Sequence, residues 1–360
     1  MRVLKCQVYI GAFQFDFVTD IEIVSSWDML TDTCTITIPK KLRYRGSDGE
    51  AKKYIVRGTE AIFKRGNEVR VDAGYYPSPE FGEIPVYNTI FEGFVTEISP
   101  KRPITIQCED SAYNLKRMRI KSYDSGDGPT DLEEMLRAVA QKVNSNTGGP
   151  SFTYLIKAES MNIGPTVLEN TTYAQFLDLL KRNYGLKSYI RKDKSTGEDT
   201  LFVGFARITQ NNQQNTFAVP NNRVELQFGR DIIDDSNLTY RNAKDIDISL
   251  TCISIDDENN RLEATAGDPW GSARNLYYYN ESQESLQKTA DEAVALFKFN
   301  GYRGSFTIFG IPDVNHGDSV LIRNGDIVDT EGEYLLEKVV KRFGQGGFRQ
   351  EIYLAERISD

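Results

Sequence analysis

The chain has 360 residues, of which 39% are hydrophobic and 26% are charged, and its formal net charge is -9. This length and composition predict about two to four folded domains and exclude a wholly disordered chain. The acidic excess argues against a strongly basic binder of duplex nucleic acid. No apolar run approaches the roughly 20 residues of a membrane helix, so we expect no membrane insertion by this chain. The first residues become polar too early for a signal peptide.

Alternating side chains predict β-strands in the first third of the chain. Residues 33–38 alternate threonine with cysteine or isoleucine, which is the period of two of a half-buried strand. Further strands are predicted over residues 89–98, where the internal Gly93 suggests a bulge, and over 104–108. Residues 43–88 are expected to form a long excursion from this sheet, with an exposed turn near residues 74–77.

The middle of the chain is predicted to be a small α/β domain. Thr130 is expected as the N-cap of a helix, with Glu133 completing a capping box. A second helix is predicted to begin near Thr172, with Gln175 in the same role, and to end at Gly185. The strands expected after it cover residues 188–191 and 200–205.

The last third of the chain returns to β-strands. Residues 245–255 alternate apolar and polar side chains. A helix is predicted over about 284–300, with Gly301 as its stop. The two separate β regions, one at each end of the chain, are compatible with diverged copies of one domain. The remaining predicted strands cover residues 305–309, 319–323, 334–343 and 348–354.

The cysteines and the single histidine form no recognisable site. The sequence contains no Cys-x-x-Cys pair, which argues against a zinc ribbon. His316 lies in a predicted turn before a strand, and no Gly-x-Ser-x-Gly nucleophile motif is present. We therefore expect no catalytic residue, no metal site and no cofactor, and hence no enzyme. The four cysteines lie far apart, at Cys6, Cys34, Cys108 and Cys252.

Two acidic segments and one basic cluster have simple structural interpretations. Residues 124–128 lack the ligand spacing of a calcium-binding loop and are predicted to lead into the first helix. Residues 256–260 are predicted to be a hairpin turn with solvated carboxylates. Because the net charge is negative, the basic cluster is interpreted as salt-bridging at a domain or subunit seam rather than as a nucleic-acid patch. This cluster comprises Lys116, Arg117, Arg119 and Lys121.

An ordered set of segments runs through nearly the whole chain. The segments are residues 91–98, 104–115, 172–180, 184–191, 285–304, 316–320, 331–340 and 347–354. In this order they resemble the first barrel, the middle domain and the C-terminal barrel of the phage baseplate or tail hub family, often called late control protein D. Related proteins form the base of the spike in contractile injection systems.

The resemblance implies a mainly β protein (α+β) with two tail-tube-like antiparallel β-barrels. A small α/β domain is expected between them, and a helix-containing insertion in the C-terminal part. The family forms trimers, in which six barrels make a ring. The expected domains are residues 1–115 with the excursion 43–88, residues 116–210, and residues 211–360 with the helix at about 284–300.

Within such a trimer we expect Tyr75 and Tyr76 as inter-subunit contacts, since exposed aromatic residues favour interfaces. The alternative is that both tyrosines pack on their own domain. The lumen of the ring is expected to be acidic and to let DNA pass by like-charge repulsion.

The function that the resemblance implies is that of a structural hub in a phage tail or phage-like injection apparatus. The hub would adapt the tail tube, or a distal tail protein, to the central spike protein. The end of the tape-measure protein is a further expected partner, and DNA is expected only in transit through the lumen. Such a protein belongs to the virion tail or baseplate and is assembled in the cytoplasm of the bacterial host.

Two other functions are alternatives. A tail-associated cell-wall hydrolase would need an added catalytic domain, and the family pattern leaves no room for one. A host-surface carbohydrate-binding β protein could stack Trp270 and the tyrosines at 277–279 on sugars, although these aromatics are expected to line a domain junction.

Overall fold

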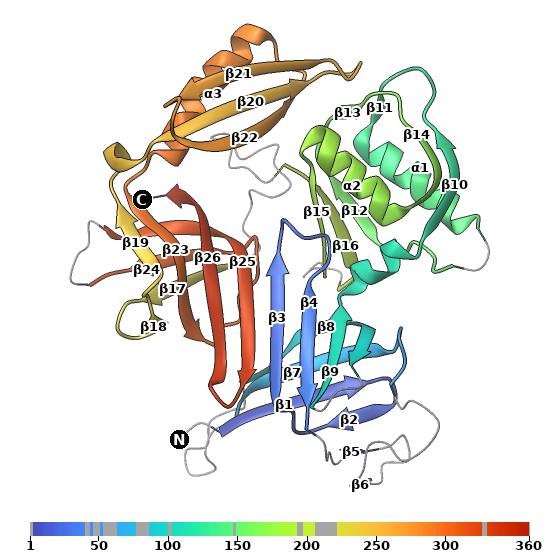
Figure 1. Cartoon of the computed structure of the whole chain (residues 1–360), viewed down its shortest axis with the longest axis vertical. Coiled ribbons are helices and arrows are strands. Elements are labelled where there is room, and N and C mark those ends of the chain that lie inside the picture. The colour runs from blue at the N-terminus through green and yellow to red at the C-terminus, as the bar shows by residue number, and fades with distance from the viewer. Residues whose placement is uncertain are drawn as a thin grey trace.

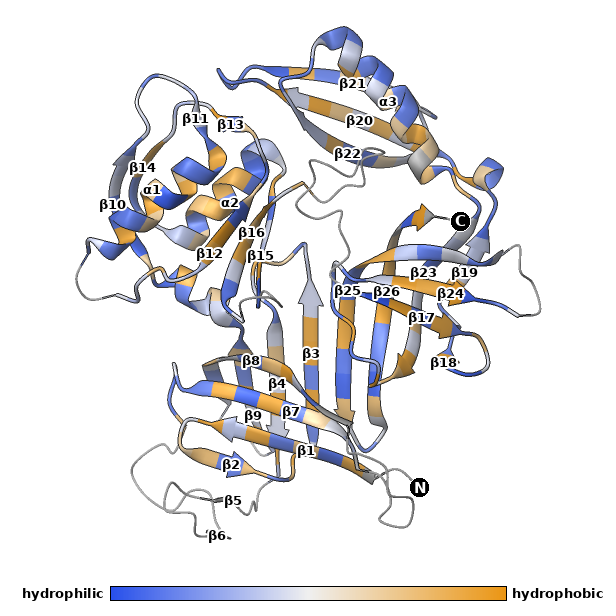
Figure 2. Cartoon of the chain, turned by 180° about the vertical axis from the view of Figure 1, so that it is seen from behind, coloured by the Kyte–Doolittle hydropathy of each residue, from blue (hydrophilic) through white to orange (hydrophobic). Residues whose placement is uncertain are grey.

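The computed structural model describes residues 3–39, 44–45, 51–52, 63–76, 86–99, 103–146, 149–192, 197–205, 222–325 and 330–359. Strands dominate, and one large sheet runs through both ends of the chain (Figure 1). This architecture confirms the mainly β prediction. Along the strands of this sheet, apolar and polar residues alternate (Figure 2). The alternation gives each strand one buried face and one more exposed face.

The first part of the large sheet, barrel 1 (residues 3–110), is antiparallel throughout. On β4, Cys34, Ile36 and Ile38 are buried in its core, and the threonines between them are only half buried. Its strands are β1 (Val3–Ile10), β2 (Phe13–Phe15), β3 (Asp20–Ser26), β4 (Thr33–Ile38), β5 (Tyr44–Arg45), β6 (Ala51–Lys52), β7 (Glu68–Tyr76), β8 (Val86–Ser99) and β9 (Ile104–Glu109).

Part of the expected excursion belongs to barrel 1. Strand β7 lies within residues 43–88 and pairs with β1 on one side and with β8 on the other. Gly74 to Tyr76 continue this strand rather than forming a turn, and Pro77 lies outside the described residues. Gly93 allows close approach of β8 to the backbone of Glu109, where a Cβ atom would clash. The bulges of β8 lie instead at Ile90, opposite β7, and at Thr96, opposite β9.

The α/β domain (residues 111–205) packs two helices on short sheets. One sheet has the order β12–β16–β15, and β10 pairs with β14. The elements are η2 (Ser111–Lys116), β10 (Arg119–Asp124), β11 (Thr130–Asp131), α1 (Leu132–Asn144), β12 (Leu155–Ala158), β13 (Asn162–Ile163), β14 (Val167–Thr172), α2 (Tyr173–Tyr184), β15 (Lys187–Lys192) and β16 (Asp199–Gly204).

One of the two predicted helix caps is confirmed and the other is wrong by one residue. Thr172 and Gln175 form the predicted capping box of α2, and Gly185 ends the helix with a left-handed φ of 70°. At α1, Asp131 is the N-cap, and its carboxylate accepts a hydrogen bond from the backbone N–H of Glu134. Thr130 and Asp131 both pair with β13, and the helix begins after the second of them, so its start lies one residue later than predicted.

The last part of the chain contains two units. Barrel 2 (residues 222–241 and 301–359) completes the large sheet, and the insertion (residues 242–300) is a separate sheet covered by one helix (Figure 1). The strands of barrel 2 are β17 (Arg223–Gln227), β18 (Ile232–Asp234), β19 (Leu238–Arg241), β23 (Gly301–Phe309), β24 (Ser319–Arg323), β25 (Gly332–Gly344) and β26 (Gly347–Ser359). The insertion comprises η3 (Ala243–Asp245), β20 (Ile248–Ile255), β21 (Arg261–Gly267), β22 (Ser272–Tyr279) and α3 (Gln283–Phe297).

The central strand of the insertion sheet, β20, is buried on both faces. Leu250 and Cys252 of β20 point toward α3, where they pack in one small core. Ile253 and Ile255 point the other way and join the core of the α/β domain, together with Tyr277. The alternation along one strand therefore attaches the insertion to two neighbours. In the described part of the chain, no helix has the length and apolarity needed to span a membrane.

Candidate assembly interface

The two barrels repeat one order of strand pairing. In barrel 1 the order is β3–β4–β9–β8–β7–β1, and in barrel 2 it is β18/β19–β23–β26–β25–β24–β17. A long hairpin lies in the middle of each order, β8–β9 in the first and β25–β26 in the second. The last step differs, because β1 is antiparallel to β7 whereas β17 is parallel to β24. Barrel 1 and barrel 2 are thus built on one plan.

The repeat extends to individual residues of the hairpins. Strand β8 carries a one-residue bulge between Val95 and Glu97 opposite β9, and β25 carries one between Leu336 and Lys338 opposite β26. With these bulges matched, Glu97 corresponds to Lys338, and the next strand of each hairpin falls into register. In this register, the facing pair of Ile106 and Ile36 in barrel 1 is equivalent to the facing pair of Ile352 and Phe306 in barrel 2. All four side chains are buried.

Barrel 1 and barrel 2 are joined edge to edge. Strand β25 pairs antiparallel with β3 from Lys338 opposite Ser26 to Gly344 opposite Asp20 (Figure 1). At the exposed surface of this joint, the guanidinium of Arg342 contacts the carboxylate of Glu22 at 2.9 Å. The outer edge of β3 in barrel 1 is therefore a place where the hairpin of another barrel can pair.

A buried ammonium group supports the joint from inside. Lys341 is only 2% exposed, and its Nζ donates hydrogen bonds to Asp313 at 2.6 Å and to Asn315 at 2.9 Å. Both acceptors lie in the loop between β23 and β24 of the same barrel. The buried charge is thus compensated by a carboxylate and an amide oxygen, as burial of an ammonium group requires.

The α/β domain meets both barrels at one aromatic cluster. Trp27, in the turn after β3, packs with Tyr189 and Phe202 of the α/β domain and with Leu335 of barrel 2. The rings of Tyr189 and Phe202 are stacked, with their centroids 5.0 Å apart. This cluster fixes the position of three domains relative to one another by apolar burial, which is the dominant stabilising contribution in such contacts.

A set of titratable groups lies beside this cluster. His316 is 1% exposed, and its Nε2 lies 3.8 Å from a carboxylate oxygen of Asp32. Arg191 of the α/β domain donates a hydrogen bond to the backbone carbonyl of His316. Burial lowers the pKa of His316 well below its ordinary value, and the nearby cations Arg191 and Lys341 lower it further. His316 is therefore a neutral residue of the domain junction.

The two nearby carboxyl groups are shifted in the opposite direction. Burial raises the pKa of Asp32, and the hydrogen bond donated by the Ser25 hydroxyl at 2.6 Å opposes this rise. Burial raises the pKa of Asp110 well above its ordinary value, and the charge of Asp32 adds to that effect. The described residues contain no cluster of three or more histidine, cysteine or acidic side chains that could hold a metal ion.

A polar cavity of about 770 Å³ opens between barrel 1 and the α/β domain beside this junction. Lys192 on one wall forms an ion pair with Glu92 on the other. Arg70 on the barrel side is paired with Asp72 at 3.0 Å. Charges of both signs therefore line the cavity, and the pair of Lys192 and Glu92 spans it.

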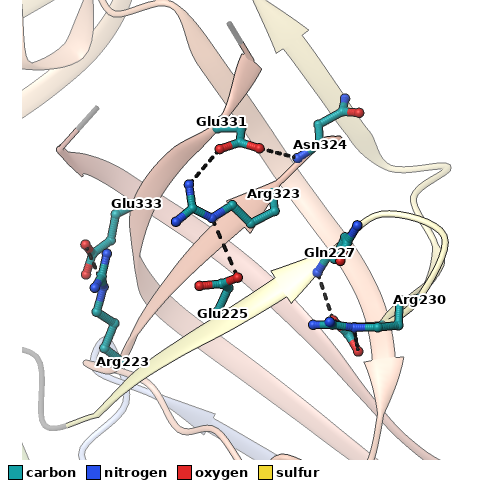
Figure 3. A network of polar contacts seen from close by, with 9 residues as sticks. Arg223, Glu225, Gln227, Arg230, Arg323, Asn324, Glu331 and Glu333 are labelled. Atoms are coloured by element: carbon teal, nitrogen blue, oxygen red, sulfur yellow. Dashed lines mark hydrogen bonds and ion pairs between the residues drawn. The ribbon is translucent and has the colours of Figure 1, made fainter. Parts of the chain in front are cut away.

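Barrel 2 carries a ladder of ion pairs over its free edge strand β17 (Figure 3). Arg323 of β24 contacts Glu331 at 2.7 Å and Glu225 of β17 at 3.7 Å. Arg223, at the start of β17, contacts Glu333 of β25 at 3.0 Å. Charged side chains on an edge strand oppose the addition of another strand. The opposite edge of barrel 2, at β18 and β19, has no such ladder among the described ion pairs.

The predicted interface residues lie at the end of β7. Tyr75 is half buried, and its hydroxyl donates a hydrogen bond to the backbone carbonyl of Phe348 in barrel 2 at 2.9 Å. Tyr76 pairs with Val3 through the backbone, and its side chain lies outside the described residues. Tyr75 therefore contacts the other barrel of its own chain, and a role of either tyrosine between subunits stays a prediction.

Both acidic segments form turns, as their residue types predict. The carboxylate of Asp124 accepts a hydrogen bond from the backbone N–H of Gly126 at 2.8 Å. The carboxylate of Asp256 accepts hydrogen bonds from the backbone N–H groups of Glu258 and Asn260. In the same hairpin turn, Asn259 accepts a hydrogen bond from the Tyr184 hydroxyl, so this turn also docks the insertion on the α/β domain.

One residue of the basic cluster, Lys116, lies at a domain seam as expected, and the aromatic residue Trp270 does not. Lys116 forms an ion pair with Glu109 at 2.6 Å, where barrel 1 passes into the α/β domain. Arg119 and Lys121 are exposed on β10. The expectation that Trp270 lines a domain junction is wrong, because this side chain is 98% exposed in the turn between β21 and β22.

The edge-to-edge joint is the feature that sequence reasoning missed. A signal for it was present, because the segment Ile36-Thr37-Ile38 of β4 resembles Phe306-Thr307-Ile308 of β23. Such short similarities do not stand out without the pairing registers. The registers are set by tertiary contacts between strands that lie far apart in the sequence.

Comparisons with known proteins agree with this architecture. No protein-family model matches the chain. No curated protein matches it in sequence either. Among solved structures, the tail protein from Neisseria meningitidis MC58 is similar over 99% of this chain and 96% of its own, at 13% identity and a TM-score of 0.58.

Two further solved structures share the fold. The 43 kDa tail protein of prophage MuSo2 from Shewanella oneidensis is similar over 99% of this chain and all of its own, at 14% identity and a TM-score of 0.56. A chain of the half-lidded Francisella PdpA-VgrG complex is similar over 99% of this chain and 58% of its own, at 9% identity and a TM-score of 0.53. The chain therefore has the fold of phage tail proteins along nearly its whole length.

Proposed function

We propose that this chain is the structural hub of a phage tail or of a phage-like injection apparatus, and that three copies form a ring of six barrels. The single observation that supports this proposal best is the edge-to-edge joint of two barrels built on one plan. If the free edges of one copy meet those of the next in the same way, six barrels alternate around the ring. Such a ring matches a sixfold tube on one face and a threefold spike on the other.

The partners proposed for the hub follow from the sixfold symmetry of one face of the ring and the threefold symmetry of the other. The tail tube or a distal tail protein binds the face where six like barrels are presented, and the central spike protein binds the face where three copies of the other domains are presented. The end of the tape-measure protein and DNA in transit occupy the lumen. The similarity to two tail proteins and to a chain of a PdpA-VgrG complex supports a place in the virion tail or baseplate.

The domain limits proposed for the hub are residues 1–115, 116–210 and 211–360. The hydrophobic cores support them in the main, because most buried residues of barrel 1, the α/β domain and barrel 2 fall into three different clusters. The exceptions lie at the contacts between domains, where Phe343 and Phe348 join the core of barrel 1, and Ile253 and Ile255 join that of the α/β domain. Limited proteolysis tests these limits, with cleavage expected near residues 210 and 211. Cleavage within β3 or β25 instead would contradict them.

The hub is proposed to work without turnover. His316 is buried and neutral at the domain junction, and its Nδ1 atom has no hydrogen-bond partner among the described residues that could orient it as a general base. A zymogram on peptidoglycan tests this point, and clearing by the purified protein would support the cell-wall hydrolase instead.

Native mass spectrometry and negative-stain electron microscopy of the purified full-length chain test the ring. The expected species has three chain masses and appears as a ring with six barrel densities. A monomer at every concentration, or an open filament, would overturn the proposal.

A further inference from the structure

Several strand edges remain without a backbone partner in the described part of the chain, among them one edge of β8 and one edge of β19. On β8, pairing with β7 ends at Phe94, and only Val95 is held further on, by Asn67 and Gly66. At Glu97 and Ile98, β8 pairs with β9 on one side alone. Strand β19 likewise pairs with β23 on one side alone. Unpaired edges with exposed N–H and C=O groups favour the addition of a further strand.

These edges are equivalent to the two strands that already pair within the chain. The hairpin bulges match Glu97 of β8 to Lys338 of β25. Strand β3 pairs with β4, and β19 pairs with β23, which is the equivalent of β4 in barrel 2. In these two pairings Val24 of β3 is equivalent to Thr239 of β19. Two residues further along each strand, Ser26 is therefore equivalent to Arg241. Within the chain, Lys338 lies directly opposite Ser26. The same geometry applied to the free edges places Glu97 directly opposite Arg241.

We propose that residues 96–98 of β8 in one copy of this chain add antiparallel to β19 of a second copy. In this pairing Glu97 lies opposite Arg241, and Ile98 lies opposite Tyr240. The inference rests on the trimeric ring proposed above and names the strands and the register by which its copies meet.

The charges at the two edges are complementary. Glu97 and Arg241 are both exposed, and neither forms an ion pair with another described residue. The existing joint uses the same chemistry, since Arg342 of β25 lies opposite Glu22 of β3 and contacts its carboxylate. Opposite charges directly across an antiparallel pair are stabilising, and like charges there are destabilising.

The choice of β19 over the other free edge of barrel 2 also follows from charge. Strand β17 is covered by the ladder of Arg223, Glu225 and Arg323, each engaged with a neighbour. Strand β19 presents the exposed Arg241, whereas the ring of Tyr240 is half buried against Tyr302 of its own barrel. Arginine is among the side chains enriched at protein interfaces.

The proposed contact is head to tail, because β8 of each copy meets β19 of the next. A heterologous contact of this kind gives a closed ring when its rotation closes and a filament when it does not. In a closed trimer, three of these contacts alternate with three β25–β3 joints.

Charge reversal tests the pairing in the full-length chain. Glu97→Arg and Arg241→Glu, each alone, place like charges opposite one another at three contacts in the ring. Each is expected to raise the protein concentration at which half of the trimers dissociate by about tenfold. The double variant Glu97→Arg/Arg241→Glu is expected to restore the wild-type concentration. The controls Glu169→Arg and Arg119→Glu, at exposed positions of the α/β domain, are expected to leave it unchanged.

A cysteine pair tests the register independently of stability. In the variant Glu97→Cys/Arg241→Cys, oxidised glutathione is expected to accept the two electrons of the paired thiols and leave a disulfide between copies. Covalent dimers and trimers should then appear on a non-reducing gel, and neither single cysteine variant should give trimers. Directly opposed positions in an antiparallel pair lie within reach of a disulfide.

The outcomes separate this inference from the proposed function. A wild-type trimer that withstands each single reversal and gives no cross-linked product overturns the β8–β19 pairing and leaves the ring standing. A wild-type chain that is monomeric at every concentration overturns the ring itself. Loss of the trimer in each single reversal with recovery in the double variant supports both.

Discussion

Arg342 of β25 lies directly opposite Glu22 of β3, although 320 positions separate them in the sequence. Their side chains are in contact at 2.9 Å on the exposed side of the joint between the barrels, while the neighbouring Lys341 is buried behind them. The joint therefore combines a solvent-exposed ion pair with a buried one. These two pairs should contribute very differently to stability.

Replacement of the buried ammonium group should destabilise the chain more than replacement of the exposed guanidinium. Lys341→Met leaves the carboxylate of Asp313 without its partner and is expected to lower the free energy of unfolding by about 2–3 kcal/mol. Arg342→Met is the matched control and is expected to cost about 0.5 kcal/mol, because solvent screens an exposed pair. Urea unfolding followed by circular dichroism measures both. Equal losses for the two variants would contradict this account of the joint.

The start of α1 gives a second prediction. Asp131→Ala removes the side chain that accepts the Glu134 N–H and should destabilise the first turn by about 1 kcal/mol. Thr130→Ala is the control, with little effect expected, because Thr130 is not the N-cap. Hydrogen exchange of the peptide that covers α1 reports this local opening directly. Faster exchange in Thr130→Ala than in Asp131→Ala would show that the cap is assigned to the wrong residue.

The four cysteines, all of them buried, give a third prediction. Burial raises the pKa of Cys6 to about 11 and that of Cys108 to about 12. The thiolate, which is the reactive form, should therefore be scarce in the folded chain at pH 8. Iodoacetamide is expected to label these residues only after unfolding in urea, as measured by mass spectrometry. Rapid labelling of the folded chain would contradict the burial of these strands.

The same thiols affect stability at high pH. Their pKa values in the folded chain lie above the ordinary value of 9.0, so the unfolded chain loses these protons first as the pH rises. The stability that these two thiols contribute should therefore be fully present below pH 9. The free energy of unfolding should fall as the pH rises from 9 toward 12. Replacement of Cys108 by alanine should reduce the slope of that fall, which unfolding curves at several pH values can measure.

His316 gives a prediction at the acid side. Its pKa in the folded chain lies well below the ordinary value of 6.5, so the unfolded chain binds this proton more readily. The contribution of His316 to stability should therefore be lost as the pH falls below 6.5. A comparison of the wild type with His316→Gln between pH 7 and 5 isolates this group from Asp32 and Asp110. A difference in unfolding free energy that does not change over this range would contradict a buried neutral histidine.

Much of the local structure could be predicted from the sequence. The capping box of Thr172 and Gln175, the alternation over residues 33–38 and the turn at 256–260 all depend on neighbours in the chain, and all three are present. The cap of α1 is less well determined by the sequence, because Thr130 and Asp131 are both good N-cap residues and the short ladder with β13 extends through both.

The joint could not be predicted in the same way. The pairing of β25 with β3, the position of Lys341 behind it and the contact of Tyr75 with Phe348 each join residues that lie far apart in the sequence. An alternating strand pattern states which face is buried but not which strand lies alongside. The fully exposed Trp270 shows the same limit, since aromatic character alone favoured a buried site.

A cryo-electron microscopy reconstruction of the purified full-length chain tests the central claim most directly. We expect a closed threefold ring in which the barrels of residues 3–110 and of residues 222–241 with 301–359 alternate, with β8 of each copy beside β19 of the next. A ring in which only one kind of barrel lines the lumen, or copies that meet through β17 instead of β19, would contradict the account.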